Sequence, residues 1–192
     1  EGIPLAYVEP EYPNSVDQLV IKAVTGEEIT SEELGGAKAH NIHSGNAHFF
    51  ASTEEECYEQ VRAVLSYLPS NNMCDSPRIA TSDPANRCEA ALRSMVPTNP
   101  NKGYDIHNVI KAIVDDGKFV EVQPMWAKNI VIGYASFYAM PVAIVANQAA
   151  VMAGCLDIDC SDKASRFIRH CDAFNVPIVT LIDVPGYLPG KS

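Results

Sequence analysis

Two glycine turns contain the residues best suited to chemistry in this sequence. Gly186 and Tyr187 lie in the segment DVPGYLPG, directly after the apolar run 178–182, and Gly35–Gly36 lie in the segment EELGGAKAH. Glycine turns can aim backbone N–H groups at an oxygen that gains negative charge, where a larger side chain would block the approach. Ligands of open α/β sheets bind beyond the carboxyl ends of strands, which is where the first turn falls. The sequence therefore predicts chemistry by backbone amides at one of these turns.

A phosphate-binding loop is the first alternative, because residues 190–192 read Gly-Lys-Ser. A P-loop has four residues between its first glycine and the Gly-Lys pair. Here only Tyr187, Leu188 and Pro189 separate Gly186 from that pair. Pro189 also lacks the amide that would face a phosphate. The spacing therefore argues against phosphate binding at this turn.

A metal site and a nucleophile are two further alternatives. His40, His43 and His48 could supply three zinc ligands, but they lie in a glycine-rich loop without a carboxylate or thiol at ligand spacing. Ordinary hydrogen-bonding histidines are favoured, and no metal is predicted. Ser44 precedes Gly45, yet the second glycine of a Gly-x-Ser-x-Gly elbow is misplaced.

The composition limits the classes of function. The 192 residues carry a net charge of −10, which argues against a general nucleic-acid surface. No apolar run approaches the ~18 residues of a membrane span, and no secretory signal opens the sequence. Six cysteines without a CxxC pair predict reduced, buried thiols in a reducing compartment.

The second half of the chain alternates strand and helix patterns around the main turn. Asp105 is the expected cap of a helix that closes at Gly117. A second helix is expected to begin at Ser161 and to stop at Asn175. The uncharged run 178–182 is typical of a strand covered on both faces. The predicted strands are 119–122, 129–134, 142–146 and 178–182.

The first half contains shorter elements. Thr30 and Glu33 stand at capping-box spacing and predict a brief helix. Residues 48–51 are predicted to form a strand, and Ser52 or Thr53 is expected to cap a helix that runs to residue 67. Residues 69–105 are rich in proline and poor in apolar clusters, which indicates a connection between two packing units.

Several long motifs, in order and at similar spacing, resemble one family. The chain is similar over nearly its whole length to the carboxyltransferase subunit of biotin-dependent acyl-CoA carboxylases, of the propionyl-CoA carboxylase β and methylmalonyl-CoA decarboxylase α types. The matching segments are EELGGAKAHNIHSGNAHF (32–49), AKNIVIG (127–133), VANQ (145–148) and MAGCLDID (152–159), with SDKASRFIRHCDAFNVPIVTLIDVPGYLPG (161–190).

The resemblance implies an α/β fold of the crotonase-like (ClpP/crotonase) type, a superhelix of β-β-α units, with parts of two such domains. Residues 1–70 would be the C-terminal part of the first carboxyltransferase domain, 71–103 the linker, and 104–192 the N-terminal part of the second. The family also implies a homo-oligomer, a hexamer, whose active sites form between the first domain of one subunit and the second domain of another. A cytoplasmic location is implied, or the mitochondrial matrix in a eukaryote.

The resemblance further implies transfer of a carboxyl group between carboxybiotin and a short acyl-CoA such as propionyl-CoA. Biotin would be carried by a partner, with a biotin carboxylase and biotin carrier as companions. Paired backbone amides would hold the thioester enolate and the biotin ureido oxygen. Gly186 and Tyr187 match half of the biotin-side oxyanion hole. The other half would follow Ser192 and the acyl-CoA half would precede Glu1, so the isolated chain is expected to be inactive.

Two alternatives stay open. The chain could belong to a methylmalonyl-CoA decarboxylase subunit that runs the reverse transfer, or to a non-catalytic CoA-binding or oligomerisation remnant. The sequence also departs from the family pattern. Ala149 replaces a proline, Tyr134–Ser136 replace a segment that usually contains Arg and Gly, Lys191 replaces a threonine and Tyr187 replaces a phenylalanine.

Overall fold

The computed structural model describes residues 16–84, 86–99 and 102–189. Contacts divide the chain into two compact units, one of Glu1–Val61 with Gln123–Trp126 and one of Arg62–Val122 with Ala127–Ser192. We call them the first and the second unit. No helix among the described residues is both long and apolar enough to cross a membrane.

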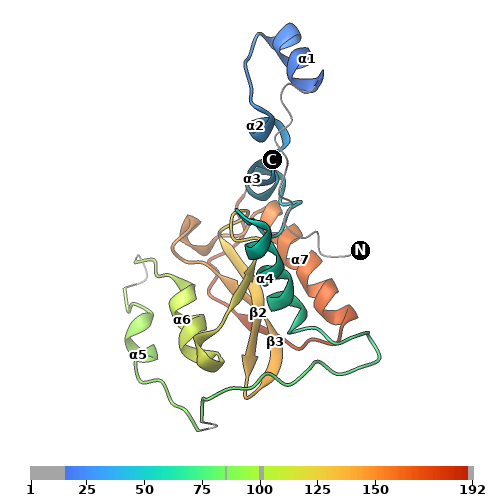
Figure 1. The fold of residues 1–192 in the computed structure, drawn as a ribbon. Coiled ribbons are helices and arrows are strands. Elements are labelled where there is room, and N and C mark those ends of the chain that lie inside the picture. The colour runs from blue at the N-terminus through green and yellow to red at the C-terminus, as the bar shows by residue number, and fades with distance from the viewer. Residues whose placement is uncertain (1–15, 85, 100–101, 190–192) are drawn as a thin grey trace. The chain divides into compact units, whose positions relative to one another are not determined.

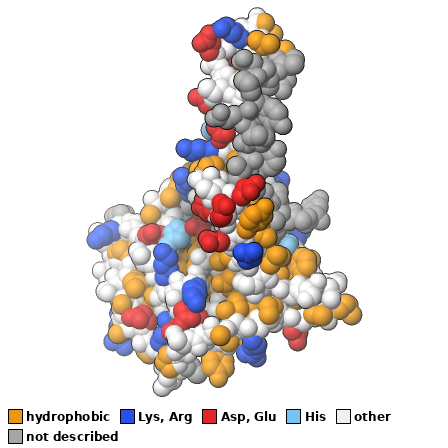
Figure 2. Space-filling view, in the orientation of Figure 1, with side chains coloured by type: hydrophobic (Ala, Val, Ile, Leu, Met, Phe, Trp, Pro, Cys, Tyr) orange, Lys and Arg blue, Asp and Glu red, His pale blue; other side chains and the backbone are white. Residues whose placement is uncertain are grey.

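The regular structure described in the first unit is helical (Figure 1). It contains α1 (Val16–Thr25), α2 (Ser31–Gly35), α3 (Ala37–Ala39), the π-helical turn η1 (His40–Ser44) and the start of α4 (Glu54–Leu65). The capping box of α2 is confirmed, since Thr30 Oγ1 accepts the Glu33 N–H and the Glu33 carboxylate accepts the Thr30 N–H. Thr53 caps α4 through the Glu56 N–H at 3.2 Å, as predicted. The first turn of α4 carries the exposed residues Glu54, Glu55 and Glu56. Figure 2 shows acidic side chains gathered on one part of the visible face.

The strand predicted at residues 48–51 is wrong. Carbonyl groups of this segment bind partners other than a neighbouring strand. Phe49 O accepts the Asn41 side-chain amide at 3.1 Å, and Phe50 O accepts the Gln60 side-chain amide at 2.8 Å. His48 O accepts the backbone N–H of Gln123 at 3.0 Å. These bonds satisfy the backbone without a sheet ladder.

The second unit is built on one four-stranded sheet, which confirms the four predicted strands. The strands are β1 (Val120–Val122), β2 (Ile130–Phe137), β3 (Met140–Asn147) and β4 (Ile178–Leu181), in the spatial order β1-β2-β3-β4. The pairs β1–β2 and β2–β3 are antiparallel, whereas β3 and β4 are parallel and joined through α7 (Ile158–Ala173). The arrangement β2-β3-α7-β4 is a β-β-α unit closed by the next strand.

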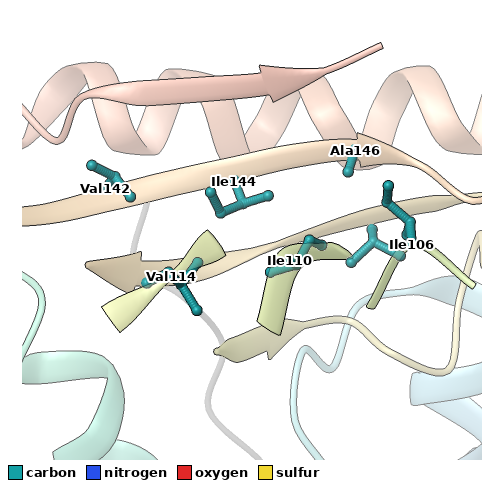
Figure 3. Close-up of a cluster of buried hydrophobic side chains, with 8 residues drawn as sticks. Ile106, Ile110, Val114, Val142, Ile144 and Ala146 are labelled. Atoms are coloured by element: carbon teal, nitrogen blue, oxygen red, sulfur yellow. The ribbon is translucent and has the colours of Figure 1, made fainter. Parts of the chain in front are cut away.

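Two helices cover opposite faces of this sheet (Figure 1). Helix α6 (Ile106–Ile113) begins at the predicted cap, Asp105, and packs on the face formed by alternate residues of β2 and β3. Its side chains meet those of β3 in Figure 3. On the other face, the Tyr134 ring of β2 meets Phe167 of α7 edge-on at 5.2 Å. The buried cluster under α6 consists of Ile106, Ile110, Val114, Val131, Ala135, Val142, Ile144 and Ala146.

The connection between α4 and α6 has little regular structure. It contains α5 (Leu92–Met95), and its Ile79 N–H donates to Ala139 O in the β2–β3 turn at 2.9 Å. Two short 3-10 turns complete the unit, η2 (Asp115–Gly117) and η3 (Met152–Gly154). None of the six cysteines forms a disulfide in the described chain, but only Cys160 and Cys171 are buried, so the prediction of buried thiols is wrong for the others.

Two further details differ from the sequence-based expectations. Helix α7 is capped by Asp157, whose Oδ1 accepts the Cys160 N–H at 2.9 Å, and Ser161 lies inside its first turn. Strand β4 is not covered on both faces. It lies at an edge of the sheet within the described chain, and Ile178 and Ile182 are 37% and 75% exposed.

Candidate functional site

The carboxyl ends of β3 and β4 bring the candidate residues together. Because the two strands are parallel and adjacent, both end at the same edge of the sheet. Asn147 and Gln148 stand at the end of β3, and Asp183 follows β4. Tyr104 reaches this edge from the residue before the cap of α6.

Asp183 is held by two hydrogen bonds. Its N–H donates to Asn147 Oδ1 at 3.4 Å, and its Oδ2 accepts the Tyr104 hydroxyl at 2.8 Å. Burial, together with the bond to Asp183, raises the pKa of Tyr104 to about 12. Tyr104 therefore keeps its proton and remains a donor throughout the physiological range of pH.

Gln148 joins the end of β3 to the start of α6. Its Nε2 donates to Asp105 Oδ1 at 2.8 Å, and its Oε1 accepts the Ile106 N–H at 3.2 Å. The His107 ring lies between two carboxylates, 2.6 Å from Asp105 and 2.9 Å from Glu121. Burial opposes a charge on His107, but these two partners outweigh it and raise the pKa of the imidazole. The start of α6 is thus tied to both β3 and β1.

The turn after Asp183 carries Gly186 and Tyr187. Gly186 O accepts the Leu156 N–H at 3.1 Å, and the Leu188 N–H donates to Leu156 O at 2.8 Å. These bonds form a parallel bridge between Leu156 and Tyr187, so the Tyr187 N–H points away from Leu156. Within the described chain, neither the Gly186 nor the Tyr187 N–H has a hydrogen-bond acceptor.

The surroundings of these two amides are open. A Cβ built on Gly186 would meet nothing within 4 Å, and the Tyr187 side chain is 72% exposed. Unpaired amides beside open space can donate to a flat, anionic group that approaches the strand edge. The predicted site residues Gly186 and Tyr187 therefore lie together, with their donors available.

The second predicted glycine turn, Gly35–Gly36, has a structural role. The Gly36 N–H donates to Glu32 O at 3.0 Å, and a Cβ on Gly36 would overlap the Glu32 carboxylate. Gly36 ends α2 and begins α3, so its glycine is explained by close packing at a helix junction. The hypothesis of an oxyanion-binding amide at Gly36 is wrong in this structure.

The other motifs are placed as follows. His40 Nδ1 lies 3.3 Å from Ser44 Oγ at the end of the π-helical turn. Among the described residues, no three His, Cys, Asp or Glu side chains gather as metal ligands. Gly190, Lys191 and Ser192 lie outside the described residues.

Sequence reasoning did not assign Tyr104, Asn147, Gln148 or Asp183 to the site. Three of them carried a usable signal, because Asn-Gln and Asp stand where two apolar strands end. Tyr104 carried none, since its partner is 79 residues away in the sequence.

The fold and the site define the class of protein. The β-β-α unit is an α/β arrangement of the crotonase-like type, and the solved structures below share this fold. The chain belongs to the carboxyl transferase domain family, whose model matches residues 18–192.

The relatives extend well beyond this chain. It is 57% identical over 173 residues to the methylmalonyl-CoA decarboxylase subunit alpha of Veillonella parvula, a match covering 90% of this chain and 34% of that protein. It is 52% identical over 171 residues to the propionyl-CoA carboxylase carboxyltransferase subunit of Haloferax mediterranei, covering 89% and 33%. The chain thus spans about a third of the length of these curated relatives.

The structural comparison agrees. The chain matches a crystal structure of transcarboxylase 12S, described as a hexamer with methylmalonyl-coenzyme A and methylmalonic acid bound, with a TM-score of 0.85 and 46% identity. That match covers 90% of this chain and 33% of the other. A single-chain long-chain acyl-CoA carboxylase matches with a TM-score of 0.73 and 27% identity.

Proposed function

We propose that the protein containing this chain transfers a carboxyl group between carboxybiotin and a short acyl-CoA such as propionyl-CoA. The observation that carries the proposal is the pair of unpaired N–H groups at Gly186 and Tyr187, in a chain of the carboxyl transferase family. These amides form one half of an oxyanion hole that faces biotin. A second half, supplied by residues outside this chain, completes it.

The residues present fit such a role. Carboxybiotin, brought by a biotin carrier partner, supplies the carboxyl group. No neighbouring atom lies within 4 Å of a Cβ position on Gly186, so a planar ureido group can approach the turn from that side. The two N–H groups are fixed by the backbone, so donating to a developing negative charge requires no reorganisation of the site.

The organisation of the parent protein follows from the same proposal. Residues 1–70 end a first carboxyltransferase domain, 71–103 are the linker, and 104–192 begin a second domain. In support, all four strands fall within 104–192, and α5 is the only helix described in 71–103. The transcarboxylase 12S hexamer supports a homo-oligomer, and six cysteines without a disulfide in the described chain suit the cytoplasm or mitochondrial matrix.

A methylmalonyl-CoA decarboxylase subunit is the second candidate, favoured by the 57% identity to the Veillonella parvula protein. It would run the same transfer from methylmalonyl-CoA toward biotin at the same amides. The companion subunits distinguish the two candidate functions. Co-purification with an ATP-dependent biotin carboxylase supports the carboxylase. Co-purification with a membrane decarboxylase supports the methylmalonyl-CoA decarboxylase.

The experiment that tests the proposal removes one amide. Tyr187→Pro in the full-length subunit deletes the Tyr187 N–H, while the two bonds to Leu156 use Gly186 O and the Leu188 N–H and can remain. With the biotin partner present, kcat is expected to fall by about 10²- to 10³-fold. Tyr187→Ala is the control because it keeps the amide. A proline variant with the kcat of the alanine variant would refute the role of this N–H.

A further inference from the structure

The turn that carries Gly186 and Tyr187 is fixed at both of its ends. Downstream, Leu156 binds Gly186 O and the Leu188 N–H. Upstream, the fixed point is Asp183, whose carboxylate accepts the Tyr104 hydroxyl at 2.8 Å. Oxyanion donors must be placed to within about 0.5 Å to work, so both ends matter for the proposed reaction.

We propose that Tyr104 is a positioning residue of the site: its hydroxyl fixes Asp183 and, through it, the directions of the Gly186 and Tyr187 amides. This inference rests on the proposed carboxyl transfer. Tyr104 does not touch the reacting groups in this proposal. It acts through Asp183 alone.

Tyr104 is itself held in place by the end of β3. Gln148 binds Asp105 Oδ1 at 2.8 Å and the Ile106 N–H at 3.2 Å, which fixes the backbone directly after Tyr104. The neighbouring Asn147 accepts the Asp183 N–H at 3.4 Å. The three segments therefore form a closed ring of hydrogen bonds from β3 to the start of α6, to the end of β4, and back to β3.

The link from Asp183 to Gly186 is short and stiff. Only Val184 and Pro185 intervene, and the proline ring fixes one of the backbone angles. A Cβ on Gly154 would lie 3.0 Å from Asp183 O and 3.7 Å from Pro185 Cδ, so the turn also packs closely on the backbone of η3. A displacement of Asp183 is therefore passed to the amides rather than absorbed.

The test uses the full-length subunit with its biotin-carrying partner. Tyr104→Phe removes the hydroxyl but keeps the ring that packs against the buried cluster of α6. The matched control is Tyr138→Phe, in the same unit, whose side chain is 64% exposed. Because a misplacement of about 1 Å can cost 10²-fold, kcat is expected to fall about 10-fold or more in Tyr104→Phe, with an unchanged KM for acyl-CoA.

Two further readouts separate positioning from a general loss of stability. Hydrogen exchange at the Leu188 amide is expected to become about 10-fold faster in Tyr104→Phe and to stay unchanged in Tyr138→Phe. Asp183→Asn keeps a carbonyl oxygen for the Tyr104 hydroxyl and should retain most of the wild-type kcat, whereas Asp183→Ala should match Tyr104→Phe.

The outcomes are distinct. Wild-type kcat in Tyr104→Phe overturns the positioning role, and so does an equal loss in Tyr138→Phe. A full-length wild-type protein without carboxyl transfer refutes the proposed function instead. In that case the Leu188 exchange still decides the inference: unchanged exchange in Tyr104→Phe overturns it, and faster exchange supports a turn held by this hydroxyl.

Discussion

Lys163 offers a sharp test of how α7 is bound to the sheet. Its side chain is fully buried, and its Nζ donates to Ile130 O at 2.9 Å and to Ala127 O at 3.3 Å. Burial lowers the pKa of Lys163 from its ordinary 10.5 to about 8, against the opposing electrostatic effect of Glu121. The perturbation we consider is Lys163→Met, which keeps a long, unbranched side chain and removes the amine.

The size of the effect follows from the pKa. A lowering from 10.5 to about 8 means that holding the amine charged in the fold costs about 3 kcal/mol. Because the unfolded chain binds more protons between pH 8 and 10.5, the contribution of Lys163 to stability rises with pH in that window. At pH 7.5 the cost of burying the charge destabilises the wild type relative to Lys163→Met, whereas the two hydrogen bonds to carbonyl groups stabilise it. The slope with pH, rather than the value at one pH, is therefore diagnostic.

The assay is urea unfolding followed by far-UV circular dichroism at pH 7.5, 8.5, 9.5 and 10.5. The free energy of unfolding of the wild type minus that of Lys163→Met should rise by about 3 kcal/mol across this range. Titrations of groups that do not interact with Lys163 cancel in the difference. Lys111→Met, at an exposed lysine of α6, is the control. A flat or falling difference for Lys163→Met would refute the reasoning.

Two other predictions concern local stability. His107→Gln removes the imidazolium that lies between two carboxylates. Because the pKa of His107 is raised in the folded state, the wild type should be more stable than the variant by about 1 kcal/mol below pH 6.5. The urea midpoints of the two proteins should converge as the pH rises through the folded pKa. Gly45→Ala should cost about 2–4 kcal/mol, since φ is +61° and a Cβ would overlap the Trp126 ring. Gly26→Ala, with φ +77° and no atom within 4 Å, should cost about 1 kcal/mol, so equal melting temperatures for the two variants would contradict this account.

The sheet and its helices were predictable because local pattern and global fold agree there. Asp105 caps α6 where the apolar periodicity begins, and every predicted strand of the second unit exists. The pattern failed where a distant partner decides the outcome. Residues 48–51 have the composition of a strand, but side chains of Asn41 and Gln60 and the backbone of Gln123 satisfy their carbonyls. Strand β4 is apolar enough for a covered position, yet the face that carries Ile178 and Thr180 stays exposed in the described chain.

The candidate site is even harder to predict from the sequence than the fold. An oxyanion hole made of backbone amides leaves almost no mark on the sequence, because every residue except proline has an N–H. The N–H groups of Gly186 and Tyr187 remain unpaired in the described chain, while Gly186 O and the Leu188 N–H are bonded to Leu156. The residues that hold this turn have no recognisable motif in the sequence. They are Leu156 on one side of the turn, and Tyr104, acting through Asp183, on the other. For a site of this kind, the informative residues are those that hold the turn.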